Sequence, residues 1–258
     1  MPLELSDLEE LKQAKALLEN PGIAAKLTNL IGTPIEKGFA LLPSNWQDKV
    51  ALITRQALMA ALKGALLTMK DSTTRSYSIW HKAGATLSGA AGGFFGLPAL
   101  AVELPVSTTI MLRSIADIGR ANGENLSTLE ARLACLEVFA LGGTSPNDDA
   151  SESAYFAVRA ALAKTVTEAV QYLAEKTIAE EGAPALVRLI ATVAARFQVQ
   201  VSEKAAAQAV PIIGAAGGAA VNYLFIDHFQ DMSRGHFTVR RLERKYGCVD
   251  VQNAYMAL

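Results

Sequence analysis

The sequence predicts an all-α protein, a single domain of about eight to ten helices. Apolar residues recur at helical spacing along nearly the whole chain, and clusters of Gly, Pro and Asn separate the periodic segments. The one strand-like alternation, residues 197–201, also fits a helical face that continues from Leu186, Ile190 and Val193. Because five residues do not make a sheet, we expect helix there as well.

Local signals place the first helices. Ser6 and Glu9 have the spacing of a capping box, which predicts that a helix begins there. A short helix is expected over residues 23–31, where a glycine follows the last apolar position. The Pro-Ser-Asn cluster at 43–45 predicts the start of a longer helix that runs to about Met69.

Similar signals place the helices of the second half. Ser127 and Glu130 form another capping box, and the helix that they begin should end at the glycine pair 142–143. A long helix with an apolar stripe follows an acidic turn. A group of polar residues surrounds the start of that helix. We interpret them as caps and braces of the helix, and the alternative is a surface recognition site. The residues are Asp148, Asp149, Glu152, Tyr155 and Arg159.

Composition excludes several classes of protein. Of the 258 residues, 51% are hydrophobic and 19% charged, which favours a large packed core over disorder. A net charge of −1 gives no electrostatic basis for binding nucleic acid. Two cysteines, no metal-binding pattern and an acidic amino terminus predict a cytoplasmic protein without a cofactor. We expect residues 1–70 to pack as a helical segment on a core of residues 71–250, in one structural domain; the oligomeric state stays open.

Two stretches without charge contain the same pentapeptide, Gly-Ala-Ala-Gly-Gly. They span residues 83–102 and 205–226, and the pentapeptides lie at 89–93 and 214–218. Glycine weakens a helix interior, so its use here indicates that two helix backbones approach closely. The stretches are rich in Ala, Gly, Ser and Thr, which favours buried packing helices; a reversibly membrane-inserted or membrane-apposed hairpin is the alternative.

Three residues next to these stretches could carry chemistry. Glu103 directly follows the first stretch, and Asp227 and His228 directly follow the second. A histidine beside carboxylates could act as a general base, although buried polar pairing is the more common role. If the stretches pack together, the three side chains should meet at one end. Asp231 and His236 are weaker candidates as metal ligands, because residues 228 and 236 point about 80° apart on an ideal helix.

Basic residues gather after the second stretch, and they allow two interpretations. Juxtamembrane clusters of this kind attract anionic lipid, whereas on a folded surface they form ordinary ion pairs. We also expect an arginine, either Arg113 or one of this cluster, to pair with Glu103. The cluster consists of Arg234, Arg240, Arg241, Arg244 and Lys245.

Several separated motifs resemble the bacterial EcsC family. They are Glu103-Leu-Pro, residues 112–116, 136–143, the acidic turn through Arg159, 210–229 and 234–247, and they occur in the family's order over about residues 75–250. The resemblance implies a bacterial protein associated by name with an ABC exporter system. It implies no biochemical activity.

These observations lead to three hypotheses. The first is a non-enzymatic accessory protein, in the cytoplasm or peripheral to the inner face of the membrane, with membrane lipid or an ABC transporter component as partner. The second is a hydrolase or metal-dependent enzyme that uses Glu103, Asp227 and His228. The third is a carrier that binds an acyl chain or lipid between the small-residue helices.

Overall fold

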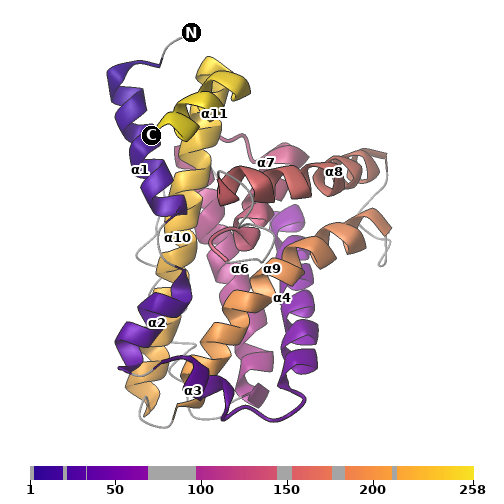
Figure 1. Cartoon of the computed structure of the whole chain (residues 1–258). Coiled ribbons are helices and arrows are strands. Elements are labelled where there is room, and N and C mark those ends of the chain that lie inside the picture. The colour runs from indigo at the N-terminus through magenta and orange to yellow at the C-terminus, as the bar shows by residue number, and fades with distance from the viewer. Residues whose placement is uncertain are drawn as a thin grey trace.

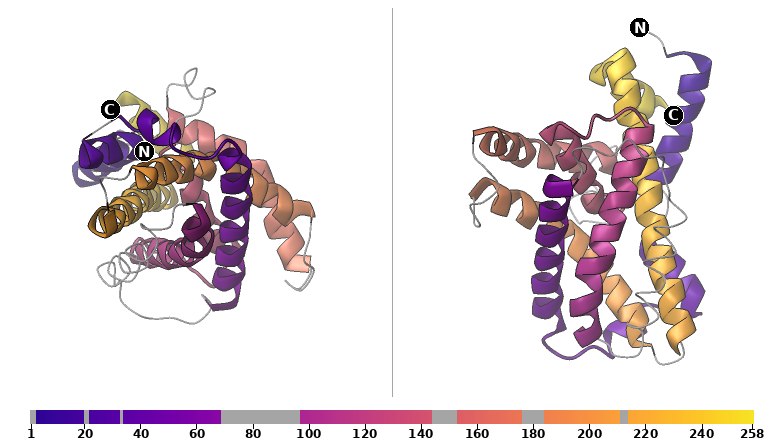
Figure 2. Two further views of the ribbon diagram at one scale, coloured as in Figure 1. Left: turned by 90° about the horizontal axis from the view of Figure 1, so that it is seen from below. Right: turned by 180° about the vertical axis from the view of Figure 1, so that it is seen from behind.

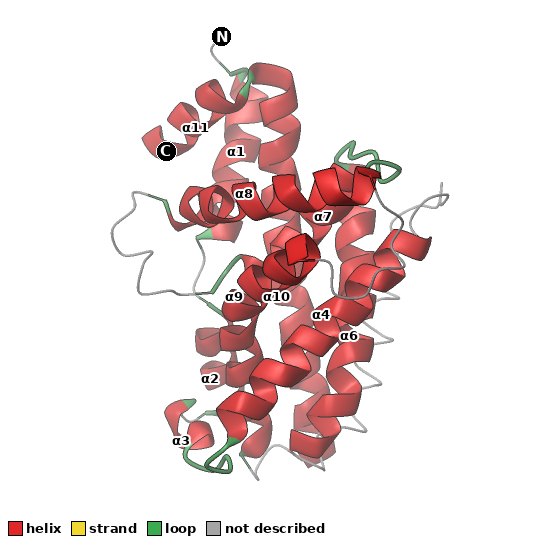
Figure 3. Cartoon of the chain, turned by 90° about the vertical axis from the view of Figure 1, so that its right-hand side faces the viewer, coloured by secondary structure: helices red, strands yellow, loops and turns green. Residues whose placement is uncertain are grey.

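The computed structural model describes residues 3–19, 22–32, 34–68, 97–143, 153–175, 184–210 and 214–258. Over these residues it contains ten α-helices, one short 3-10 helix and no strand, which confirms the predicted all-α domain (Figure 3). The helices are α1 (Leu5–Leu18), α2 (Ile23–Ile31), α3 (Glu36–Phe39), α4 (Trp46–Thr68), α6 (Leu97–Ala121), α7 (Leu129–Glu137), η1 (Val138–Ala140), α8 (Ala154–Glu175), α9 (Pro184–Ala209), α10 (Gly214–Tyr246) and α11 (Cys248–Ala257).

Two expectations fall outside the described residues. Residues 83–96 of the first neutral stretch are among them, with their pentapeptide, and so are Asp148, Asp149 and Glu152. The segment 197–201, with its strand-like alternation, lies inside α9 as expected. None of the described helices is both long enough and apolar enough to cross a membrane.

Helices α6 and α10 form the long axis of the molecule and run side by side in the same direction (Figures 1 and 2). Gln230 donates to the Ser114 hydroxyl over 2.8 Å, and the Ser233 hydroxyl donates to a carbonyl oxygen of α6 over 3.4 Å. The residues that pair are 116 and 118 positions apart along the chain, as expected for two helices that run parallel to each other. Short serine side chains at this contact let the two backbones lie close.

The amino-terminal helices pack against the same frame. Helix α1 lies along α10, where a Cβ atom added at Gly235 would come within 3.0 Å of the Ala14 carbonyl oxygen. Helix α3 lies on α9, and a Cβ atom at Gly38 would overlap the Ala206 carbonyl oxygen. Glycine is therefore required at two described helix contacts, because any side chain would force the backbones apart.

The structure corrects two helix starts. Helix α1 begins at Leu5, so Ser6 lies inside it and makes no cap. Its entry is fixed instead from α10, because the Glu4 amide donates to the Tyr246 hydroxyl over 3.2 Å. Helix α7 is capped by Thr128, whose hydroxyl accepts from the Ala131 amide over 3.3 Å, one residue later than predicted.

A proline and a break shape the backbone around the two neutral stretches. Helix α6 continues through Pro105, from Leu97 to Ala121. Packing against α4 on one side and α10 on the other outweighs the missing amide donor. The second neutral stretch does not form one helix, because α9 ends at Ala209 and α10 begins at Gly214.

Candidate functional site

Glu103 takes part in a buried ion pair that joins three helices. The ammonium group of Lys204 on α9 donates to both of its carboxylate oxygens, at 2.9 and 2.8 Å, and the Asn222 amide of α10 donates over 3.2 Å. The side chains of Lys204 and Glu103 are 0% and 5% exposed. Lys204 also lies 4.8 Å from the ring centroid of Phe225, a cation–π contact. This pair therefore fixes α6, α9 and α10 to one another.

His228 occupies a different place on α10. Its Nε2 atom lies 3.5 Å from Gln200 Nε2, and that same amide donates to the Leu141 carbonyl over 2.6 Å. The ring packs against Gly142, which has a φ of 72° and where a Cβ atom would lie 2.6 Å from the ring. Burial and, to a lesser extent, the charge of Lys26 lower the pKa of His228 to about 4, against the opposing effect of Asp227. The neutral imidazole thus fills the space between α9, α10 and the turn after η1.

The structure does not bring Glu103 together with His228. The hydrogen bonds of Glu103 go to Lys204 and Asn222, and Asn222 precedes His228 by about 9 Å along the α10 axis. The expected partner of Glu103 was an arginine, either Arg113 or one of the basic cluster, but Lys204 takes this place. Arg113 is exposed about 15 Å further along α6. Of the three residues predicted as one catalytic group, Glu103 therefore lies apart from His228, whereas the charge of Asp227 does act on His228.

The two weaker metal candidates are also apart. Asp231 binds Arg234 over 2.8 Å and Lys26 over 3.3 Å. His236 is fully buried, and its Nδ1 atom lies 3.1 Å from the Tyr155 hydroxyl. Within the described ranges, no three His, Cys, Asp or Glu side chains are grouped so that they could hold a metal ion.

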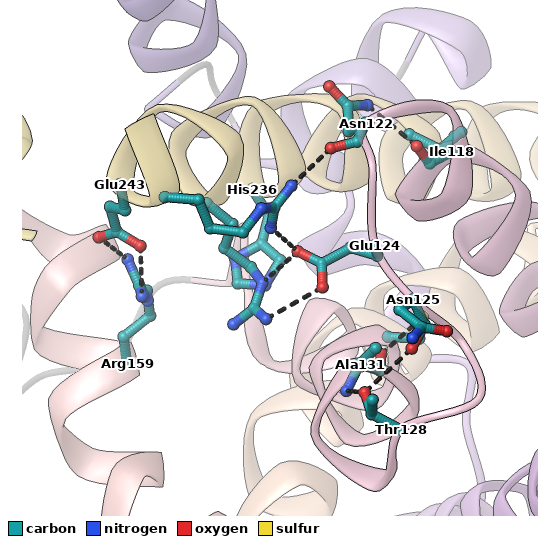
Figure 4. Close-up of polar contacts among 12 residues, drawn as sticks. Ile118, Asn122, Glu124, Asn125, Thr128, Ala131, Arg159, His236 and Glu243 are labelled. Carbon is teal, nitrogen blue, oxygen red and sulfur yellow. Dashed lines mark hydrogen bonds and ion pairs between the residues drawn. The ribbon is translucent and has the colours of Figure 1, made fainter. Parts of the chain in front are cut away.

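The basic residues near the end of α10 are paired with carboxylates from distant segments. Arg240 binds Glu124 over 2.8 and 3.2 Å, and Arg244 binds the same carboxylate (Figure 4). Burial alone would raise the pKa of Glu124, but hydrogen bonds and charge from the two arginines outweigh it and lower the pKa. On the opposite side of α10, two basic residues bind carboxylates of α1: Arg241 binds Glu10, and Lys245 binds Asp7.

A second polar network connects the surface with His236. Arg159 of α8 forms a bidentate pair with Glu243 at 2.7 and 2.9 Å (Figure 4). Its Nη1 atom also donates to the Tyr155 hydroxyl over 3.4 Å. The Tyr155 oxygen thus accepts from Arg159, so its own proton points to Nδ1 of His236. Burial keeps the pKa of His236 well below its ordinary value, and the neutral ring then carries its proton on Nε2. Nε2 has no hydrogen-bond partner in the described part of the chain.

A pocket of about 430 Å³ opens beside this network. Arg159 and Arg240 line it together with Glu243 and with Glu137, the last residue of α7. Burial raises the pKa of the Glu137 carboxyl, although the charges of Arg240 and Arg159 oppose the shift. The remaining lining residues are Phe156, Ala160, Ala163, Val166, Thr167, Cys248 and Gln252.

Sequence reasoning missed three carboxylate or ammonium groups that organise these contacts: Glu124, Glu137 and Lys204. Two of them had a visible signal. Lys204 is the last charge before the second neutral stretch, just as Glu103 is the first charge after the other. Glu137 interrupts the apolar run 133–141, where a carboxylate needs a special environment. Glu124 lies in a polar turn and carried no such signal.

The fold and these contacts define a class: a single-domain helical protein in which several ion pairs join different helices. More specifically, the chain belongs to the EcsC protein family, whose model matches residues 6–242. The match begins well before residue 75, so it includes the amino-terminal helices as well as the motifs that carry the resemblance, the last of them up to residue 242. Searches of curated proteins and of solved structures found no match.

Proposed function

We propose that this chain is a non-enzymatic accessory protein that docks on the cytoplasmic face of a membrane, beside an ABC exporter, through apolar side chains at the amino-terminal end of α6. The observation that carries the proposal is the exposure of Val102 and Val106, which are 74% and 49% accessible. They lie one helical turn apart and so share a face of α6. Membership of the EcsC family supports the exporter as the neighbouring system.

The exposed valines have a rigid support. Glu103 lies between them in sequence and points the other way, into the buried pair with Lys204. Asn222 binds Glu103 from α10, and the next residue, Tyr223, is 45% exposed. A valine pair with a tyrosine nearby is the composition that suits the boundary between headgroups and acyl chains.

The environments of the candidate catalytic residues favour an accessory role over an enzyme. The Glu103 carboxylate is held by an ammonium and an amide, and His228 is 1% exposed in a packed site. A general base has to reach a substrate proton directly or through one water. Neither group has a path of that kind among the contacts described above.

The contact surface that we propose is hydrophobic, because the basic cluster is occupied. Arg240, Arg244 and Lys245 all face carboxylates, which reduces the charge left for anionic lipid. We therefore expect membrane binding that depends weakly on salt and on lipid charge.

Liposome flotation tests the proposal. The wild type should float with both neutral and anionic vesicles, and about 0.5 M salt should change this little. The double variant Val102→Ser/Val106→Ser should bind roughly thirtyfold less, because about 2 kcal/mol of apolar transfer is lost at their combined exposure. Val249→Ser is the matched control, since Val249 is 70% exposed on α11, beyond the other end of α10.

Three results would contradict the proposal. They are a protein that never floats, flotation that needs anionic lipid and disappears in salt, or equal loss in the Val249→Ser control. The second result would instead indicate that the basic cluster binds the membrane through anionic lipid.

A further inference from the structure

The pocket beside α8 has the chemistry of a ligand site, which goes beyond the accessory role. We propose that it binds a small amphiphilic anion, a carboxylate or phosphate group attached to a short hydrocarbon chain. The proposal rests on three features of the lining: two guanidinium groups, a largely buried carboxyl group that opens onto the pocket, and an apolar stripe.

The guanidinium groups reach the pocket from two helices. Arg159 comes from α8 and Arg240 from α10, and each already holds one carboxylate. A guanidinium has five N–H donors in a planar fork, so one carboxylate does not exhaust it. Arg240 uses Nε and Nη2 toward Glu124, and its Nη1 donates to no carboxylate of the described residues. Two guanidinium groups on different helices, each with N–H donors left over, suit an anionic oxygen group.

Glu137 supplies an independent indication of a ligand. Its side chain lines the pocket, it is 9% exposed, and it makes no hydrogen bond to any residue that the structure describes. Its carboxylate oxygens are not among the fully enclosed, unpaired polar atoms of the described residues, so they open onto the pocket, where a bound group can meet them. Burial raises its pKa, which favours the neutral form with a proton to donate. A neutral Glu137 would add a third donor for a bound anion and would not repel it.

One wall of the pocket is apolar. Phe156, Ala160, Ala163 and Val166 follow one another at helical spacing, so they form a stripe along α8. The stripe begins in the same turn as Arg159, and it therefore leads away from the charged end. A ligand with its anionic group at the arginines would lay a hydrocarbon chain of a few carbons along this stripe.

Cys248 makes the pocket accessible to experiment without any mutation. It lines the pocket and is exposed, whereas Cys135, the other cysteine of the chain, is buried. Burial also raises the pKa of the Cys135 thiol, so this thiol does not compete for an alkylating reagent. The rate of alkylation by iodoacetamide therefore reports on Cys248.

The experiment measures this rate for the wild-type chain with octanoate, octyl phosphate, acetate, octanol and octylammonium. We expect octanoate or octyl phosphate to slow alkylation about tenfold at saturation, and each methylene that is removed to weaken binding by up to about fourfold. Whichever of the two anions binds better identifies the source as a free acid or a phosphate headgroup. Protection by octanol or octylammonium as strong as that by the anions would overturn the proposal, and so would equal protection by acetate.

Two variants locate the ligand. Ala163→Trp fills the pocket from α8 and should raise the half-protecting concentration more than tenfold, while Ala161→Trp, an exposed position outside the lining, should leave it unchanged. Neither removes a charge or a buried side chain, and circular dichroism confirms that each is folded. Equal effects of the two would sink the assignment. The site lies away from Val102, so its failure and the failure of membrane docking are separate outcomes.

Discussion

Removing one member of the buried pair between Glu103 and Lys204 should be among the most damaging single changes in this protein. Lys204→Met keeps the length of the side chain but deletes the ammonium group, and it leaves a carboxylate that is 5% exposed with only the Asn222 amide as a partner. Breaking a buried pair from one side costs about 3 to 5 kcal/mol, because the remaining charge is not compensated. The cation–π contact with Phe225 is lost as well, so we expect the upper half of this range.

Urea unfolding followed by circular dichroism measures this cost. The double variant Glu103→Gln/Lys204→Met removes both charges, and its Gln side chain can still accept from Asn222. It should recover most of the loss and lie within about 2 kcal/mol of the wild type, since replacing both members of a buried pair is often close to neutral. The matched control is Arg188→Met, which breaks an exposed pair with Glu168 and should cost less than about 1 kcal/mol.

Two outcomes would refute this reasoning. If Lys204→Met costs no more than the exposed control, the pair is not buried as the structure has it. If the double variant is as unstable as the sum of the two single variants, the two groups do not interact, because a double-mutant cycle isolates their coupling.

Three further predictions concern packing and pH. Gly38→Ala should destabilise the protein by about 1 to 3 kcal/mol, because the added Cβ atom overlaps the Ala206 carbonyl. Gly64→Ala, where the added Cβ atom would lie 3.9 Å from Thr109, should stabilise α4 by up to about 1 kcal/mol. Equal effects of the two variants in urea unfolding would contradict the close contact at Gly38. Burial lowers the pKa of His228 to about 4 from 6.5, so the unfolded state binds the extra proton between these values. Stability should therefore fall by about 1.4 kcal/mol per pH unit from this group as the pH drops from 6.5 to 4, and His228→Gln should remove that part of the slope in urea titrations at several pH values. The pairs with the arginines lower the pKa of Glu124, so this residue stabilises the folded state above pH 4.5, its ordinary pKa, and the stabilisation is lost as the pH falls below that value. In urea unfolding at several acid pH values, Glu124→Gln should lose less stability with falling pH than the wild type. An unchanged loss would count against the pairs with the arginines.

The helical architecture could be predicted because its causes are local. Apolar spacing and Gly or Pro at the ends determine where a helix forms, and both are visible in a window of a dozen residues. The errors occurred where a distant segment decides. Ser6 failed as a cap because Tyr246 at the end of α10 binds the chain two residues earlier. Likewise Pro105, a residue that usually interrupts a helix, lies inside α6 because α4 and α10 hold this helix along its length.

The candidate site shows the same limit at the level of side chains. The sequence placed Glu103 correctly as a carboxylate that needs a partner, but Lys204 lies 101 residues away on a helix whose neighbours only the fold determines. The pocket was beyond prediction for a similar reason. It forms where α7, α8, α10 and α11 meet, and no local pattern in Glu137 or Cys248 gives that meeting.

The partners of the basic cluster explain why neither proposed contact surface uses the donors that these residues already give to carboxylates. Arg241 and Lys245 hold α1, Arg240 and Arg244 hold the turn after α6, and Glu243 holds α8 through Arg159. The last three turns of α10 thus act as the point at which three distant segments are fixed, and each arginine there has a structural task. A cluster that must hold three segments cannot also release its charges to a membrane without loosening the fold. A contact surface at the other end of α10, near Val102, and a ligand pocket that uses only the spare donors of Arg159 and Arg240 avoid this conflict.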